Sequence, residues 1–334
     1  MSNNSSVETN ASQWFSYRTP GPNMFTYYYR ATVTLDTIFI VAGTLINVWF
    51  LAAILLSREL RSRMRNKFIC GLLVVNLAET FIHLPMSVIR GVVGALYAYH
   101  LLNCHFISAA NNIYHIIDFV GNWYILILVC VYMAQILTFE PQLTPVWKNI
   151  VTAVIFTAPC VFAVLLVPLT MKTFSPIPSS RCLINSPKAT EVYRSLDTIV
   201  PQVLASLLLI ATAVVRQRRY PYARFFASRT QLTVDRSQTD PWSPFVALLV
   251  TAVASDFGLV VVYMNATIMN RLDSKTWLIV YFTIKALSYL RVILLPLMLL
   301  LFPDIRERTK AWRPCRRSAS SPADLVVTYE RNTS

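Results

Sequence analysis

Seven long apolar segments are the feature that most constrains what this chain can fold into. A helix needs about 20 mostly apolar residues to cross the hydrocarbon core of a membrane. The chain has 334 residues, of which 55% are hydrophobic and 14% are charged, whereas a soluble domain usually carries about 25% charged residues. We therefore predict an all-α membrane protein, a seven-transmembrane helix bundle. Its expected spans are residues 35–56, 68–89, 105–138, 149–170, 195–215, 243–267 and 276–302.

The basic residues indicate which loops lie in the cytoplasm. They gather after the first, fifth and seventh spans: Arg58, Arg61, Arg63, Arg65 and Lys67; Arg216, Arg218, Arg219, Arg224, Arg229 and Arg236; Arg306, Arg308, Lys310, Arg313, Arg316 and Arg317. Cytoplasmic loops carry such an excess, so we expect a multi-pass plasma-membrane protein with an extracellular N-terminus. The net charge is +14, but the basic residues lie between apolar segments and form no continuous patch, which argues against a nucleic-acid partner. These arginines also suit contacts with anionic membrane lipids.

The segments outside the spans complete the expected organisation. Residues 1–34 are predicted to be an extracellular tail glycosylated at Asn3, Asn4 and Asn10, each of which begins an Asn-x-Ser pattern. Residues 35–302 form the bundle. Residues 303–314 are expected to form a short amphipathic eighth helix in the membrane interface, because Phe302, Ile305 and Trp312 share one helical face. Residues 315–334 are the expected cytoplasmic tail. No cleavable signal peptide is recognised, so the first span is expected to act as an uncleaved anchor.

The cysteines fall into two groups. Three lie inside apolar segments and are expected to be small buried residues: Cys70, Cys130 and Cys160. Cys104 and Cys182 fall in stretches expected outside the cell, where oxidation is possible. No metal-ligand spacing occurs among Cys and His, and no nucleophile–base pair or phosphate loop is visible. We therefore expect no metal, no cofactor and no enzymatic activity.

Several landmarks occur at characteristic separations. Gly43 and Asn47 lie in the first span, Asn76 follows 29 residues later and Pro85 nine residues after that. Cys104 begins the third span, and prolines 201 and 296 interrupt the fifth and seventh. Over residues 32–315 this pattern resembles a rhodopsin-like (class A) G protein-coupled receptor. The resemblance implies a Cys104–Cys182 disulfide, palmitoylation of Cys315, and three partners: an extracellular ligand, a heterotrimeric G protein and an arrestin.

The departures from the family pattern are equally clear. The family's Asp-Arg-Tyr is replaced by residues 129–135, Val-Cys-Val-Tyr-Met-Ala-Gln, and its Asn-Pro-x-x-Tyr by residues 295–299, Leu-Pro-Leu-Met-Leu. The Cys-Trp-x-Pro motif is also missing from residues 252–258. Tyr289 stands where a visual opsin has its retinal lysine. The resemblance therefore implies a divergent receptor, and it leaves open a receptor-like decoy or scaffold that does not couple to a G protein.

Ionisable residues within the spans are the first set of candidate site residues, because charges in a bilayer usually face the bundle interior. In the family pattern, Arg291 and Asp118 surround a sodium pocket near Asn47 and Asn76. We expect the Arg291 guanidinium to replace the ion and to pair with Asp118 or with Glu79. A static brace and a moving switch both remain open. Asp256 is expected to make an inward hydrogen bond to an unassigned partner.

A second set of candidates lies nearer the outer mouth. The resemblance implies ligand contacts at Asn111 and His115 in the third span. Polar or aromatic neighbours are expected at comparable depth: Tyr114, His83, Tyr263 and Tyr281. Lys285 either attracts an anionic ligand group or forms a salt bridge to an outer-loop acid such as Asp273. A peptide ligand is favoured over a small molecule, because Asn111 offers no carboxylate to an amine.

The leading hypothesis is thus a cell-surface receptor that signals through a heterotrimeric G protein. A transporter or channel is the main alternative, in which Asp118, Arg291, Glu79 and Asp256 would form a charged relay through the bundle.

Overall fold

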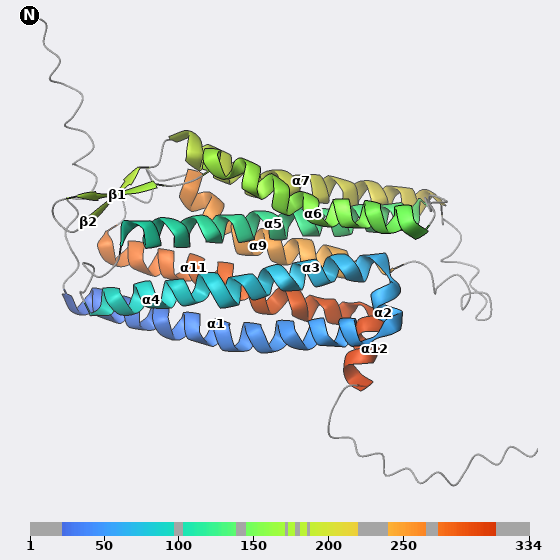
Figure 1. The fold of residues 1–334 in the computed structure, drawn as a ribbon, viewed down its shortest axis with the longest axis horizontal. Helices are drawn as coiled ribbons and strands as arrows, with labels where there is room; N and C mark the ends of the chain where they lie inside the picture. Colours follow the sequence, from blue (N-terminus) through green and yellow to red (C-terminus); the bar gives the residue numbers. More distant parts are fainter. Residues whose placement is uncertain are drawn as a thin grey trace, which may run out of the picture.

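A computed structural model describes residues 22–96, 103–137, 145–170, 173–177, 181–185, 188–219 and 240–264, and finally residues 273–311. Its long helices run side by side in one elongated bundle (Figure 1). In chain order they are α1 (Pro22–Leu56), α3 (Met64–Ala78), α4 (Leu84–Ala95), α5 (Cys104–Ile136), α6 (Pro145–Thr170), α7 (Lys188–Arg219), α9 (Ser243–Met264) and α11 (Ser274–Met298). The shorter elements are α2 (Arg58–Ser62), η3 (Glu79–His83), η5 (Leu299–Leu301) and α12 (Pro303–Ala311).

The bundle has an apolar exterior and a partly charged interior. Exposed apolar side chains include Leu45, Val164 and Phe257, each about two-thirds exposed, while Asn47, Glu79 and Arg291 are buried. Apolar side chains on the outside and charged side chains in the interior are the arrangement expected of a protein surrounded by lipid. Within the described residues, six helical segments are long and apolar enough to cross a membrane, and the apolar segment Ser243–Gly258 of α9 is shorter. The chain is therefore a multi-pass α-helical membrane protein, and its seventh span remains a prediction.

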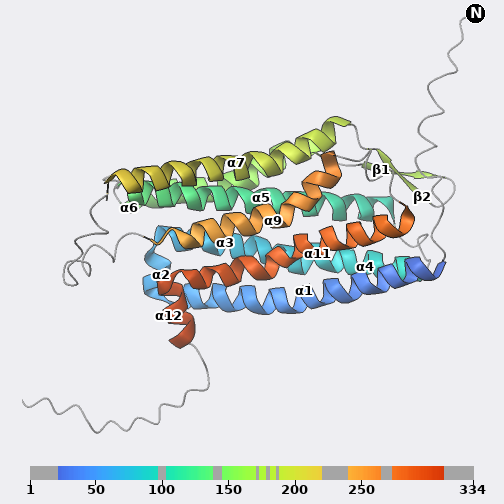
Figure 2. The same cartoon turned by 180° about the vertical axis from the view of Figure 1, so that it is seen from behind.

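The helices pack in an order that leaves α5 in contact with several others. It packs against α3, α6, α7 and α9, while α1 packs against α4, α3 and α11. The two groups share α3, and they are also joined by the contact between α9 and α11 (Figure 2). The largest apolar cluster lies where α3, α5 and α9 meet, with Phe68, Tyr132 and Phe245 almost fully buried.

The second expected span is one continuous helix with a local change of winding. Residues 79–83 form the π-helical turn η3 between α3 and α4, and Pro85 occupies the first turn of α4. Single π-turns within α-helices often occur at functional sites. This turn places Glu79 and His83, both buried, at its two ends.

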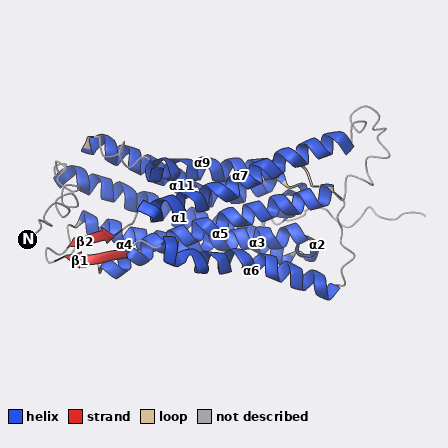
Figure 3. Cartoon of the chain, turned by 90° about the horizontal axis from the view of Figure 1, so that it is seen from above, coloured by secondary structure: helices blue, strands red, loops and turns tan. Residues whose placement is uncertain are grey.

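Two features differ from the sequence-based expectations. The first helix begins at Pro22, thirteen residues before the expected first span, and the boundary between the extracellular tail and the bundle stays a prediction. A two-stranded antiparallel hairpin, β1 (Thr173–Ile177) and β2 (Arg181–Asn185), interrupts the all-helical pattern. Figure 3 shows this hairpin at the end of the bundle opposite α2, and we call the two ends the hairpin end and the α12 end.

The expected amphipathic segment after the last span is helical. The chain passes through η5 and a non-helical Phe302 into α12, which lies across the bundle direction (Figure 1). Phe302, just before α12, and Ile305 on it are fully buried, whereas the position of this helix in the membrane interface stays a prediction. Trp312, Cys315 and the tail lie outside the described residues, as do the sequons at Asn3, Asn4 and Asn10.

Candidate functional site

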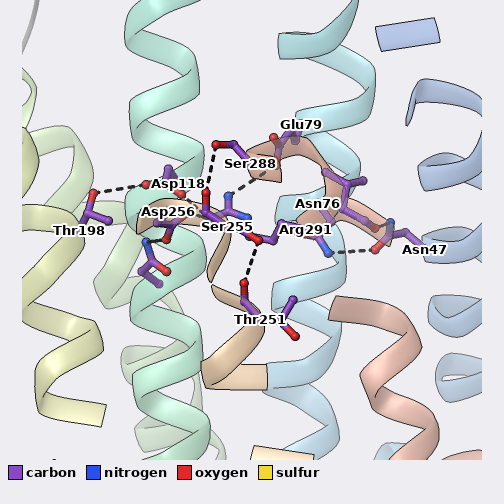
Figure 4. A network of polar contacts seen from close by, with 12 residues as sticks. Asn47, Asn76, Glu79, Asp118, Thr198, Thr251, Ser255, Asp256, Ser288 and Arg291 are labelled. Carbon is purple, nitrogen blue, oxygen red and sulfur yellow. Dashed lines mark hydrogen bonds and ion pairs between the residues drawn. The ribbon is translucent and has the colours of Figure 1, made fainter. Parts of the chain in front are cut away.

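Arg291 is the centre of a buried ionic cluster in the middle of the bundle. Its guanidinium contacts carboxylates from three different helices: Asp118 on α5, Glu79 at the start of η3 and Asp256 on α9. The distance from Nη2 to Glu79 Oε2 is 3.5 Å, and from Nη1 to Asp256 Oδ1 it is 3.3 Å. All four residues are at most 4% exposed. The predicted pairing of Arg291 with Asp118 and Glu79 is thus present, and Asp256 is an additional partner (Figure 4).

Neutral side chains complete the hydrogen bonding of two of the three acids. Asn122 Nδ2 and Gln202 Nε2 donate to Asp256 Oδ2 at 3.0 and 2.6 Å. Thr198 Oγ1 donates to Asp118 Oδ2 at 3.4 Å. Because Thr198 and Gln202 belong to α7, the cluster joins η3, α5, α7, α9 and α11. Sequence reasoning left Asp256 without a partner, since neutral amides give no charge signal in a sequence.

The two landmark asparagines meet beside this cluster. Asn76 Nδ2 donates to Asn47 Oδ1 at 3.2 Å. Asn47 Nδ2 donates to the backbone carbonyl oxygens of Gly43 and Val292, at 2.7 and 2.9 Å. One amide therefore ties α1, α3 and α11 together at the residue that follows Arg291. Nearby, Ser288 Oγ donates to the Ser255 carbonyl at 3.1 Å and joins α11 to α9.

Lys285 has a different partner from the one expected. Its Nζ donates to Asp36 Oδ2 at 2.9 Å and to Ser87 Oγ at 3.0 Å, and it lies 5.2 Å from the Tyr289 ring centroid. The predicted salt bridge to Asp273 is wrong. Asp273 instead caps α11, accepting from the Thr276 backbone amide at 3.2 Å. Hydrogen bonds from Thr276 lower the pKa of the exposed Asp273 carboxyl.

Lys285 misses Asp273 for a geometric reason. Asp273 lies twelve positions earlier on the same helix, which is about 18 Å of helix rise and beyond the reach of a lysine side chain. Asp36, by contrast, is on a neighbouring helix at the same depth as Lys285 and is fully buried. Burial of the ammonium group in a bilayer favours a partner within the bundle over one at its surface.

Three aromatic rings, from His83, Tyr114 and Tyr289, lie between Lys285 and Arg291. The His83 ring is 4.7 Å from that of Tyr114 and 5.6 Å from that of Tyr289, measured between centroids. Tyr114 and Tyr289 are themselves 6.2 Å apart in an edge-on arrangement. His83 and Tyr114, both predicted ligand contacts, therefore pack against each other and connect the two charged clusters.

The remaining predicted ligand contacts are dispersed. His115 Nε2 lies 3.4 Å from Asp197 Oδ2, so this histidine faces α7 and not Lys285. It borders a small crevice between α5, α6 and α7, lined by His115, Ile116, Phe119, Ala163, Leu166 and Asp197. Asn111 Nδ2 is buried without a hydrogen-bond partner in the described part of the chain. Tyr281 lies on α11, and the side chain of Tyr263 is outside the description.

Arg194 is a residue that the sequence did not single out. It is 1% exposed, and its Nη2 donates to Asn112 Oδ1 at 2.7 Å, joining α7 to α5. A buried partner such as Asn112, which is uncharged, leaves no sequence signal.

The cysteines match the sequence pattern in part. Cys70, Cys130 and Cys160 carry free thiols, whereas Cys104 does not. Cys130 and Cys160 are exposed at the apolar surface instead of buried. The side chain of Cys182, on β2, lies outside the description, so its pairing with Cys104 remains a prediction. Among the described residues, no three His, Cys, Asp or Glu side chains are placed to hold a metal ion.

A second ionic cluster lies at the α12 end of the bundle. Arg65, at the start of α3 and 1% exposed, contacts Asp240, just before α9, and Asp304 on α12. Its guanidinium carbon also lies 4.3 Å from the centroid of the Phe302 ring. We call Arg65, Asp240, Asp304 and Phe302 the Arg65 latch. Sequence reasoning treated Arg65 only as one of several topology-determining arginines.

Aromatic stacking continues from the latch into the bundle. Phe245 on α9 lies 5.3 Å from Phe302 and stacks on Tyr132 of α5 at 4.4 Å, measured between ring centroids. Arg216 Nη1 on α7 donates to the Tyr132 hydroxyl at 3.2 Å. The α12 end is thus closed by contacts that reach α3, α5, α7, α9 and α12.

Two comparisons with known proteins found no match for this chain. No family model matches the chain, and no curated protein matches it significantly.

Proposed function

We propose that this chain is a cell-surface receptor of the rhodopsin-like G protein-coupled class, with seven spans, an extracellular N-terminus and α12 as the cytoplasmic eighth helix. The observation that carries the proposal is the Arg291 cluster. A single buried cation in contact with acids from three helices makes the relative positions of η3, α5 and α9 depend on one side chain. A ligand that favours one of two such packings shifts the population between them.

The contacts at the hairpin end of the bundle favour a ligand that carries an anionic group. Lys285 is buried and paired with Asp36, so an incoming carboxylate, such as a peptide C-terminus, would compete with Asp36 for the ammonium group. The aromatic rings of His83, Tyr114 and Tyr289 would then transmit the shift from Lys285 towards Arg291. This supports a peptide over a cationic amine.

The contacts at the α12 end fit an inactive packing of the bundle. The Arg65 latch holds the start of α9 and α12 against α3, which is the face that a G protein would need to open. An arrestin would use the same face together with a phosphorylated tail. Anionic lipids would contact the basic residues around it.

Clustering of the charges also bears on the alternatives. The side chains of the proposed relay meet in one cluster at the middle of the bundle: Glu79, Asp118, Asp256 and Arg291. A transport pathway instead needs polar groups spaced along its length. This arrangement supports a switch over a relay.

Energy-transfer reporting of G-protein dissociation in cells tests the proposal, with every major G-protein subtype and with a peptide library. Ligand-dependent or constitutive dissociation that is lost in Arg291→Gln would support it. Lys275→Gln is the matched control, because it removes an exposed cation from the same helix. Silence across all subtypes, with surface expression verified by an epitope tag, would contradict coupling. Solute flux dependent on Asp118 would favour a transporter.

A further inference from the structure

The three acids around Arg291 are not equivalent in their hydrogen bonding. Asp256 accepts from Asn122, Gln202 and Arg291, and Asp118 accepts from Thr198 and Arg291. Both carboxylates therefore have hydrogen-bond donors from neighbouring helices. In the described part of the chain, neither carboxyl oxygen of Glu79 accepts a hydrogen bond. Its only charged contact there is the guanidinium nitrogen at 3.5 Å, which exceeds a normal hydrogen-bond distance.

Charge balance within the cluster points in the same direction. Three ionised carboxylates around one guanidinium would leave a net charge of about −2 inside a bilayer, where an uncompensated charge is strongly unfavourable. Arg291 is the one cation in contact with Glu79 among the described side chains. Lys285, the next cation towards the hairpin end, is already paired with Asp36.

The other groups that face Glu79 supply no further positive charge. From α5 these are Asp118 and the Tyr114 hydroxyl, and from α9 Asp256. From α11 they are Arg291 and the Tyr289 hydroxyl. On the α1 side, the nearby Asn47 is neutral and bonded to Asn76. His83, at the other end of the same π-turn, is buried with Nδ1 unpaired in the described part of the chain.

The π-turn η3 explains why Glu79 and His83 direct polar atoms into the interior of the bundle. A π-turn inserts one extra residue per turn into a helix and turns the flanking side chains out of α-helical register. Both ends of η3 direct a buried, incompletely bonded side chain, Glu79 and His83, into the bundle. Single π-turns within α-helices often occur at functional sites, and this one places both groups in the bundle interior.

We propose that Glu79 is a proton-binding site, which holds a proton at neutral pH and releases it in a second packing of the bundle. With the proton bound, Arg291 is shared between Asp118 and Asp256. When the O–H bond of Glu79 breaks and the proton passes to solvent, the new carboxylate competes with Asp118 for Arg291 and pulls α11 towards η3. This site does not depend on G-protein coupling, because proton release from Glu79 needs no G protein.

Infrared spectroscopy of the full chain in lipid nanodiscs tests the proposal. The spectrum of the wild type at neutral pH is expected to contain the C=O stretch of a protonated carboxylic acid, which disappears on alkaline titration. Glu79→Gln is expected to remove this band, while Asp118→Asn and Asp256→Asn retain it. A band that survives in Glu79→Gln, or a spectrum with no such band, would overturn the assignment.

Thermal unfolding of the same variants gives an independent result. A group that holds its proton more firmly in the folded state adds stability at low pH and loses it as pH rises. The melting temperature of the wild type should therefore fall with rising pH over a range where that of Glu79→Gln stays level. Glu79→Gln should match the wild type at neutral pH, whereas Asp118→Asn should melt earlier. A Glu79→Gln protein that fails to fold, or melts as early as Asp118→Asn, would show that an ionised Glu79 is required.

Discussion

Gly43 on α1 and Val292 on α11 lie in direct contact, with no room between them for a side chain on the glycine. A Cβ at position 43 would stand 2.5 Å from Val292 Cγ1 and 2.9 Å from Thr80 Cγ2. The same two residues are joined by Asn47, whose amide donates to both of their carbonyl oxygens. The close approach of the two backbones thus permits the hydrogen bonds that fix α1 against α11.

The first prediction follows from this contact. Gly43→Ala should destabilise the bundle by about 1–3 kcal/mol, because the added methyl group overpacks the interface. Val292→Ala in the same chain should restore much of the loss by removing the clashing methyl groups. Thermal unfolding in detergent measures both. If Gly43→Ala alone unfolds at the wild-type temperature, the two helices are less closely packed than described.

The second prediction concerns the Arg291 cluster. Arg291→Gln should destabilise the protein by about 3–5 kcal/mol, because it leaves buried carboxylates without their cation. Asp118→Asn in the Arg291→Gln background should cost less than it does in the wild type, since the charge it removes is then unpaired. A double-mutant cycle on unfolding free energies gives this coupling. Additive effects of the two substitutions would contradict the ion pair.

The depth of these residues could be predicted from the sequence, but most of their partners could not. In the family pattern that the chain resembles, the positions of Asp118 and Arg291 relative to Cys104 and Pro296 surround one pocket, which is why their pairing was expected. Counting does not set the rotation of each helix about its axis. Asp256 was therefore placed at the correct depth without Asn122 and Gln202, which face it from α5 and α7.

Lys285 and Arg65 show two other limits of the sequence. Asp36 lies at the start of the expected first span, and nothing in the sequence pairs it with Lys285 on α11. Arg65 belongs to a run of basic residues whose common explanation is membrane topology. Only the fold distinguishes the buried Arg65 from the half-exposed Arg63.

The third prediction tests the Lys285–Asp36 pair. Lys285→Met and Asp36→Asn should each destabilise the protein by about 3–5 kcal/mol, because each leaves a buried charge unpaired. The double variant should recover part of that loss, since neither charge then remains. Lys275→Met, on the exposed start of α11, serves as the control and should have little effect. A double variant whose destabilisation equals the sum of the two single effects would contradict the pairing.

The fourth prediction concerns the Arg65 latch, which holds α12 and the start of α9 against α3. Arg65→Ala removes both ion pairs and the contact with Phe302, so α12 should open more often while the rest of the bundle stays folded. Hydrogen exchange followed by mass spectrometry should show faster exchange in residues 303–311 and at the start of α9, with unchanged exchange in α5.

Arg63→Ala is the matched control for the latch. Arg63 also pairs with Asp304, at 3.1 Å, but its side chain is 48% exposed, and surface pairs contribute only about 0–1 kcal/mol. Its exchange pattern should therefore stay close to that of the wild type. Equal effects of the two variants would mean that α12 is held by charge alone and not by the buried guanidinium. Faster exchange throughout the bundle in Arg65→Ala would mean that Arg65 supports the whole fold, and a latch that opens by itself would then be ruled out.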